Sequence, residues 1–83
     1  MNEEQTVATV EILRNAGCTS AWIFTDSDVT ETGFLVPEAD LDWVAPYQSP
    51  LMKATCISLM RVFPRSKVFI GPYRRGLPLR QLY

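Results

Sequence analysis

The sequence predicts an α+β fold, a small single domain spanning residues 1–83. Two segments with helical periodicity carry start and stop signals, and short segments rich in β-formers lie between turn residues. The 47% hydrophobic content is that of a folded chain. We expect two main helices packed on one face of a mainly antiparallel sheet of three to four strands, in the order α-β-β-α-β-β.

The first helix is expected from about Glu3 to Ala16. Asn2 is suited to accept a hydrogen bond from a free backbone amide of the first turn. Glu3 and Glu4 suit the positive N-terminal end of the helix dipole. Gly17 is suited to the left-handed conformation that ends many helices, so this segment has both a start and a stop signal.

Two strands are expected next, over residues 18–25 and 29–36, separated by a short acidic turn. Trp22 and Phe24 share one face of the first strand, and the apolar residues between and beside them share the other face. Apolar residues on both faces indicate a central strand, which we expect to pair with the second strand as a hairpin. Gly33 indicates a bulge in the second strand.

Residues 38–44 admit two interpretations. Pro37 at the start, followed by acidic residues in the first turn, favours a short helix from Glu38 to Val44. An ordered loop is the alternative, and the sequence alone does not decide between the two.

The longest helical segment begins at Pro50, directly after the capping residue Ser49, and ends before Pro64. Proline disfavours helical geometry in the residue before it and cannot continue the hydrogen-bond ladder. Apolar side chains spread over one broad arc of this helix. They are Leu51, Met52, Cys56, Leu59, Met60, Val62 and Phe63.

Ile57 lies outside this arc, between Lys53 and Arg61 on the predicted solvent side. A lone exposed isoleucine is common on protein surfaces. The alternative is a contact with a partner or a second subunit, with the two cations at its rim. We expect a homodimer, because pairing would bury additional apolar area for so short a chain.

The C-terminal segment is expected to form a hairpin. Residues 67–70 read as a short strand, residues 73–76 as a tight turn, and residues 77–83 as a returning strand. Pro78 confines the returning strand to a sheet edge, because proline cannot donate to the ladder.

Charge is segregated along the chain, although the net charge is only −1. All acidic residues lie between Glu3 and Asp42, and every charged side chain after Asp42 is basic. The two halves either pair their charges within one fold or are solvated, or they form one acidic and one basic surface that orients a partner.

The chain has no histidine, and its two cysteines, Cys18 and Cys56, belong to different predicted elements. Neither metal-ligand spacing, a nucleophile–base motif nor a phosphate-binding glycine loop occurs, so we expect no metal, no cofactor and no enzymatic activity. The cysteines are expected to be small buried apolar residues. Since no apolar stretch of about 18 residues exists and no signal peptide is recognisable, we expect no membrane span and a cytoplasmic location.

Two functional hypotheses remain. The first is a small protein–protein interaction module, an adaptor or inhibitor, which uses the basic and aromatic C-terminal hairpin opposite an acidic N-terminal half. The alternative is a nucleic-acid-binding domain that uses the same hairpin, although the pI of about 5.2 is unlike the basic character expected of such domains. The candidate partner-binding residues are Tyr73, Arg74, Arg75, Arg80, Tyr83, Lys53, Ile57 and Arg61.

Overall fold

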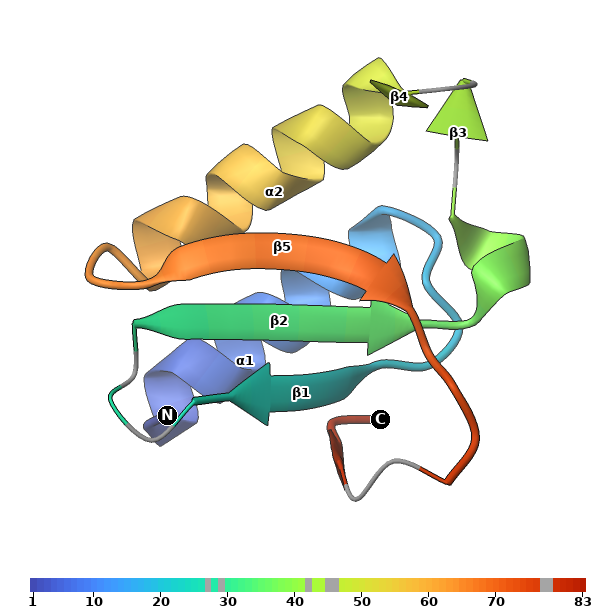
Figure 1. Cartoon of the computed structure of the whole chain (residues 1–83). Coiled ribbons are helices and arrows are strands. Elements are labelled where there is room, and N and C mark those ends of the chain that lie inside the picture. The colour runs from blue at the N-terminus through green and yellow to red at the C-terminus, as the bar shows by residue number, and fades with distance from the viewer. Residues whose placement is uncertain (27, 29, 42, 45–46, 77–78) are drawn as a thin grey trace.

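The computed structural model describes residues 1–26, 28, 30–41, 43–44, 47–76 and 79–83. Two helices lie behind a four-stranded sheet, and a small two-stranded ribbon lies beyond one end of the second helix (Figure 1). The α+β class is therefore confirmed. The elements are α1 (Glu3–Asn15), β1 (Trp22–Thr25), β2 (Glu31–Val36), the 3-10 turn η1 (Glu38–Asp40), β3 (Trp43–Val44), β4 (Tyr47–Gln48), α2 (Pro50–Val62), β5 (Lys67–Pro72) and β6 (Arg80–Gln81).

Local hydrogen bonds define both helices where the sequence predicts them. Asn2 and Gln5 form a reciprocal capping box, in which the Gln5 amide donates to Asn2 Oδ1 over 2.8 Å. Ser49 Oγ accepts from the Met52 amide over 3.2 Å at the start of α2. Gly17 follows α1 with a φ of +89°, a conformation that glycine adopts at little cost. Both predicted helices are thus confirmed to within about one residue of their expected ends.

The sheet has the strand order β5-β2-β1-β6 and is mixed. As expected, β1 and β2 form an antiparallel hairpin. The expected C-terminal hairpin is wrong, because β6 pairs with β1 while β5 runs parallel to β2 at the other edge. The crossover through α2 carries the chain back along the sheet and so makes β5 parallel to β2. Leu82 and Tyr83 pack against the core beside Ala21, and this packing holds β6 on β1 at the opposite edge. Of the predicted returning strand, residues 77 and 78 lie outside the described residues.

The core lies between the helix layer and one face of the sheet. Leu13 of α1 and Leu59 of α2 are fully buried, together with Phe34 of β2. Two residues of the predicted apolar arc of α2, Leu51 and Met60, lie instead at its exposed flanks. The buried side of α2 is therefore narrower than the predicted apolar arc, because a helix that packs on a sheet buries only part of its circumference.

The interpretation of residues 38–44 is decided in favour of an irregular segment. Only η1 is helical, and Leu41 is already extended, with φ −76° and ψ +123°. Residue 42 lies outside the described residues, and β3 then pairs with β4. The Asp40 carboxylate accepts hydrogen bonds from the backbone amide and hydroxyl of Thr19, over 2.9 Å and 2.6 Å. This contact ties the segment to the turn that precedes β1.

Candidate functional site

The face of the sheet opposite the helices carries aromatic side chains that no described helix or strand covers. Successive residues of a strand point to opposite faces, so Phe24 of β1 and Phe69 of β5 share this open face with Trp22. Phe24 is 39% exposed and Phe69 is 40% exposed. An aromatic side chain with this exposure in the middle of a sheet is available to a partner.

Gly33 of β2 determines how the centre of this open face is shaped. It lies in register between Phe24 and Phe69, and the Phe69 ring lies over it. A Cβ atom at this position would come within 2.2 Å of Phe69 Cζ. The expected bulge at Gly33 is absent, since the described register is continuous along β2. The glycine instead permits a close approach of an aromatic ring to the backbone.

Tyr73 extends the aromatic surface toward the end of β5. Its backbone amide donates to the Val36 carbonyl over 2.8 Å, which continues the parallel ladder. Its ring stacks on Trp22, with 3.7 Å between the ring centroids and 12° between the planes. The stacking fixes the orientation of both rings on the open face.

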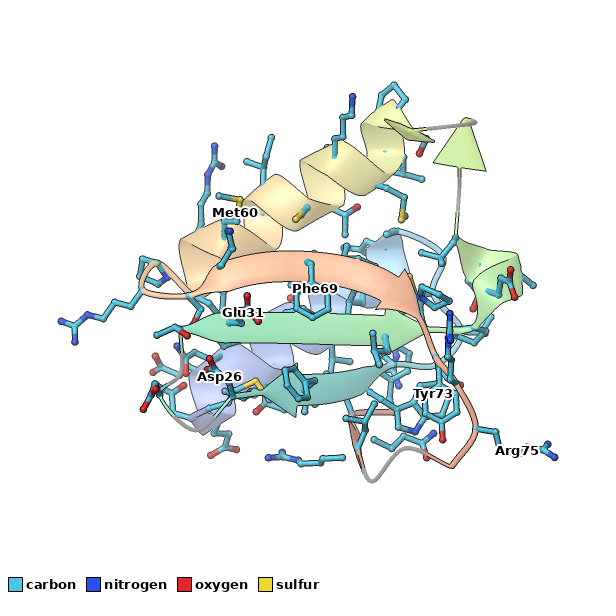
Figure 2. All side chains as sticks on the ribbon, viewed as in Figure 1. Asp26, Glu31, Met60, Phe69, Tyr73 and Arg75 are labelled. Carbon is cyan, nitrogen blue, oxygen red and sulfur yellow. The ribbon has the colours of Figure 1, made fainter. Side chains whose placement is uncertain are left out.

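Charged residues of both signs lie at the ends of the open face. Figure 2 shows Phe69 in the middle, with Asp26 and Glu31 toward one end of the strands and Tyr73 and Arg75 toward the other. The Thr30 hydroxyl donates to the Asp26 carboxylate and is the main cause of a lowered pKa for that carboxyl, together with the Glu31 backbone amide. Asp26 therefore stays ionised well into the acidic range.

The structure separates the predicted site residues of the C-terminal segment. Tyr73 lies on the open face, and Arg74 and Arg75 follow it as exposed residues. Arg80 is exposed on β6, which is the sheet edge opposite β5. Tyr83 lies elsewhere, since it packs against the core, and it is not presented to a partner on the open face.

Tyr83 is held by two neighbours near the end of α1. Its hydroxyl donates to the Cys18 carbonyl over 2.6 Å, and the Arg14 guanidinium lies 4.6 Å from its ring centroid. Burial raises the pKa of the Tyr83 hydroxyl to about 12, and this is the largest of several effects. These contacts give Tyr83 a structural role.

The remaining predicted site residues lie on α2. Lys53, Ile57 and Arg61 are all exposed, and Ile57 retains 52% of its accessible surface. Because α2 packs against the sheet face opposite Phe69, these residues and the open face lie on different layers of the molecule. The candidate site predicted from the sequence therefore contained residues from two separate surfaces.

The two charge classes do not neutralise each other within the described residues, where no salt bridge occurs. Asp26 is bonded to Thr30, and Asp40 to Thr19. Arg74, Arg75 and Arg80 thus have no carboxylate partner in the described part of the chain. Their guanidinium groups remain available for an acidic group from outside.

No protein-family model, no curated protein and no solved structure matches this chain. The chemistry of the surfaces is thus the basis for any functional inference. Among the described residues, no group of three or more histidine, cysteine or carboxylate side chains is placed to hold a metal ion. The described part of the chain also contains no helix long and apolar enough to cross a membrane.

Both cysteine thiols are at least partly withdrawn from solvent. Cys18 is buried and Cys56 is partly buried, and both are free. Burial raises the pKa of each thiol, and in Cys18 the nearby Asp40 carboxylate raises it further. Because the thiolate is the reactive form, both side chains are expected to be inert packing residues.

Sequence reasoning missed Phe24 and Phe69 as site residues. A signal was present, because the alternation in β1 places Trp22 and Phe24 on one face, while both main helices were expected on a single face of the sheet. One face of an apolar sheet therefore had to remain open. The role of Phe69 depended on the parallel pairing of β5 with β2, which the local sequence does not reveal.

Proposed function

We propose that the chain is a small, non-enzymatic protein–protein interaction module of adaptor or inhibitor type, which binds another protein on the open face of its sheet. A single observation carries the proposal: Phe24 and Phe69 are 39% and 40% exposed on the face that the helices leave uncovered. Rigid aromatic side chains supply a large contact area at a low entropic cost, and they dominate the centres of interfaces.

The distribution of charge supports a protein partner. An aromatic centre with charged residues around it is the usual anatomy of a protein interface, in which the core is desolvated and the rim stays polar. Arg74 and Arg75 lie at the rim beside Tyr73, where they can pair with carboxylates of the partner. At the other end Asp26 and Glu31 would repel the phosphates of a nucleic acid, and Lys67, which lies in register with Glu31, offsets only part of this charge.

The absence of histidine from the chain supports a non-enzymatic role, because nucleophilic and acid–base catalysis usually depend on it. The raised pKa of both thiols points in the same direction. A module of this kind acts by occupying or bridging surfaces, for which shape and charge are sufficient.

The test is affinity capture by the tagged chain, followed by quantification of a specific retained protein with purified components. Phe24→Ser with Phe69→Ser should weaken binding by at least tenfold, since central aromatic residues contribute most of the affinity. Arg74→Glu with Arg75→Glu should do the same, and both variants should melt close to the wild-type temperature because these side chains are exposed.

Lys53→Glu with Arg61→Glu is the matched control, since it reverses the same number of charges on α2 and should leave binding to the open face intact. A stable Phe24→Ser/Phe69→Ser variant that binds the partner at full affinity would remove the open face from consideration. Loss of binding in the α2 control alone would move the docking site to the helix layer.

A second candidate function is binding of single-stranded nucleic acid. The observation that favours it is that Phe24 on β1 and Phe69 on β5 lie on either side of β2 on the uncovered face, and exposed aromatic residues on a sheet can stack bases. Titration of a fluorescently labelled single-stranded oligonucleotide at low and at high salt separates the two functions. Nucleic-acid binding should lose affinity steeply with salt, because counterions are released from the phosphates.

A further inference from the structure

The outer surfaces of the two helices carry exposed apolar residues within surfaces of opposite charge. Val7 of α1 is 60% exposed, and Ile57 of α2 is 52% exposed. Neither residue contributes to the core, which is formed by Leu13, Leu59 and the sheet. One exposed apolar side chain is ordinary by itself, but each of these two lies among charges of a single sign, and the two surfaces carry opposite signs.

The outer surface of α1 is predominantly acidic. Thr9 and Leu13 face inward, so the helical period of 3.6 residues directs Glu4, Val7 and Glu11 away from the core. Glu3 adds a further exposed carboxylate in the first turn. The one cation on this helix, Arg14, is placed over the Tyr83 ring. Val7 is therefore flanked by carboxylates on both sides along the helix.

The outer surface of α2 is cationic. Met52, Thr55 and Leu59 face inward, and the same periodicity places Ile57 on the solvent side. Lys53 and Arg61, four residues before and after Ile57, are exposed, and α2 contains no acidic residue. The charge pattern on α2 is thus the complement of the pattern on α1.

The helices lie side by side and run in opposite directions on the same layer. Gln5 Nε2 in the first turn of α1 donates to the Val62 carbonyl at the end of α2 over 3.1 Å. At the other end of α1, Asn15 and Ala16 line a shallow groove together with Leu51 from the start of α2. Both outer surfaces therefore face the side of the molecule opposite the open sheet face (Figure 1).

We propose that two copies of the chain associate through their helix layers, with α1 of each copy lying on α2 of the other. Val7 of one copy then lies on the same strip of the interface as Ile57 of the second copy, displaced from it along the helix axis by the rise of about three residues. The carboxylates of α1 face the cations of α2. The interface is isologous, because the same contact occurs twice around a two-fold axis parallel to the helices. Because acidic and basic residues are segregated along the sequence, the acidic surface of α1 is complementary to the basic surface of α2 in an identical copy.

The positions of the charges follow from this symmetry. Rotation about an axis parallel to the helices keeps each residue at its own height along the helix axis. Since the start of α1 lies beside the end of α2, Glu3 and Glu4 of one copy come close to Arg61 of the second copy. Glu11 comes to the middle of α2 of the second copy, within reach of Lys53.

The two other pairings of the helices are unfavourable. An antiparallel contact of α2 with α2 of a second copy, centred on Ile57, would bring Lys53 close to Arg61 of the second copy. A contact of α1 with α1 would bring carboxylates together. Like charges opposed across an interface oppose association, so only the contact of α1 with α2 satisfies both surfaces. The dimer leaves both open sheet faces uncovered and is independent of the function proposed for them.

Sedimentation equilibrium at micromolar concentration is the first test. The wild-type chain should behave as a dimer, whereas Val7→Lys and Ile57→Asp should each weaken dimerisation by at least tenfold, because each places in the interface a charge of the same sign as the helix that it faces. Phe69→Ser on the open face is the control and should remain a dimer. Higher salt should weaken the wild-type dimer by screening the charges at its rim. A wild-type chain that stays monomeric throughout would overturn the proposal.

A charge exchange tests the pairing itself. Lys53→Glu with Arg61→Glu makes both helices acidic, and Glu4→Lys with Glu11→Lys makes both helices basic. Each variant alone should be monomeric, and an equal mixture of the two should form a heterodimer, since both contacts are then complementary.

Failure of the mixture to associate, while each variant melts as a folded protein, would overturn the pairing of α1 with α2. Dimerisation of either variant alone at wild-type affinity would do the same. If one exchange variant does not fold, the Val7→Lys and Ile57→Asp variants still decide whether the helix layer is the interface.

Discussion

The two faces of the four-stranded sheet are both apolar, but they are covered to very different extents. On the helix side, Ile23, Phe34 and Ile70 retain 9%, 0% and 3% of their exposure. On the open side, Phe24 and Phe69 retain 39% and 40%, although they come from the same sheet. The apolar residues on the helix side are explained by the stability that their burial gives to the fold. The open side gains much less from burial, so its aromatic character is better explained by binding.

The sharpest test of this difference compares one phenylalanine from each face. Phe34→Ala should lower the free energy of unfolding by about 3–5 kcal/mol, because it leaves a cavity in the core. Phe69→Ala should cost less, about 1–2 kcal/mol, because its ring contacts Gly33 but keeps 40% of its surface exposed. Urea unfolding measures both values. Similar losses for the two variants would mean that the open face is part of the stabilising core.

A substitution of Thr9 tests whether the buried polar groups between the helices and the sheet are hydrogen-bonded. Its side chain is fully buried on α1, and its hydroxyl has no hydrogen-bond partner. Thr9→Val keeps the shape and removes the unsatisfied group, so stability should rise by about 1 kcal/mol. Thr6 is the control, because its hydroxyl donates to the Asn2 carbonyl over 2.9 Å, and Thr6→Val should bring no gain. A loss of stability in Thr9→Val would show that the hydroxyl is satisfied in solution.

Tyr83 and Tyr73 extend the comparison to the C-terminal segment, since one packs on the helix side and the other on the open face. Burial raises the pKa of Tyr83 to about 12. The protonated hydroxyl of Tyr83 makes its full contribution to the stability of the fold at any pH below about 10, the pKa of a tyrosine in the unfolded chain. That contribution is lost as the pH rises through the folded value. A pH titration of tyrosinate absorbance should show a late step that disappears in Tyr83→Phe, a variant expected to cost about 1 kcal/mol.

If the wild-type chain shows no late step, the packing of Tyr83 against the core is wrong. The late step should persist in Tyr73→Phe, which removes a ring hydroxyl from the open face instead.

Lys53 should show the smallest effect. It is exposed on the outer surface of α2 and forms no salt bridge with a described residue. Lys53→Ala should therefore change the free energy of unfolding by about 0.5 kcal/mol or less in dilute solution. A thermal melt measures this difference, and a shift of several degrees would show that the outer surface of α2 contributes to the fold.

The sequence predicted those residues of the candidate site that a local run of arginine and tyrosine reveals. Tyr73, Arg74 and Arg75 stand out locally as a basic and aromatic cluster, and the structure places Tyr73 and Arg75 at one end of the open face. Tyr83 belongs to the same cluster in sequence, but its hydroxyl is bonded to the Cys18 carbonyl, 65 residues earlier in the chain. No local pattern encodes a contact of that separation.

The sequence by itself determined the helices and the first hairpin. Asn2, Ser49 and Gly17 act through hydrogen bonds and backbone angles within a few residues, and such interactions are readable from a short segment. The alternation in β1 likewise determined which of its residues would face the helices.

Only the tertiary structure decided the partners of β5 and β6, and with them the composition of the open face. The strand at Lys67–Pro72 presents the same alternation whether it pairs with the next strand or with β2. The pairing partner of β5 depends on where α2 ends once the helix has packed on the sheet. The packing of α2 depends on the whole core. The pairing of β5 with β2 brings Phe69 over Gly33 and beside Phe24, because strand register acts between segments that are distant in sequence.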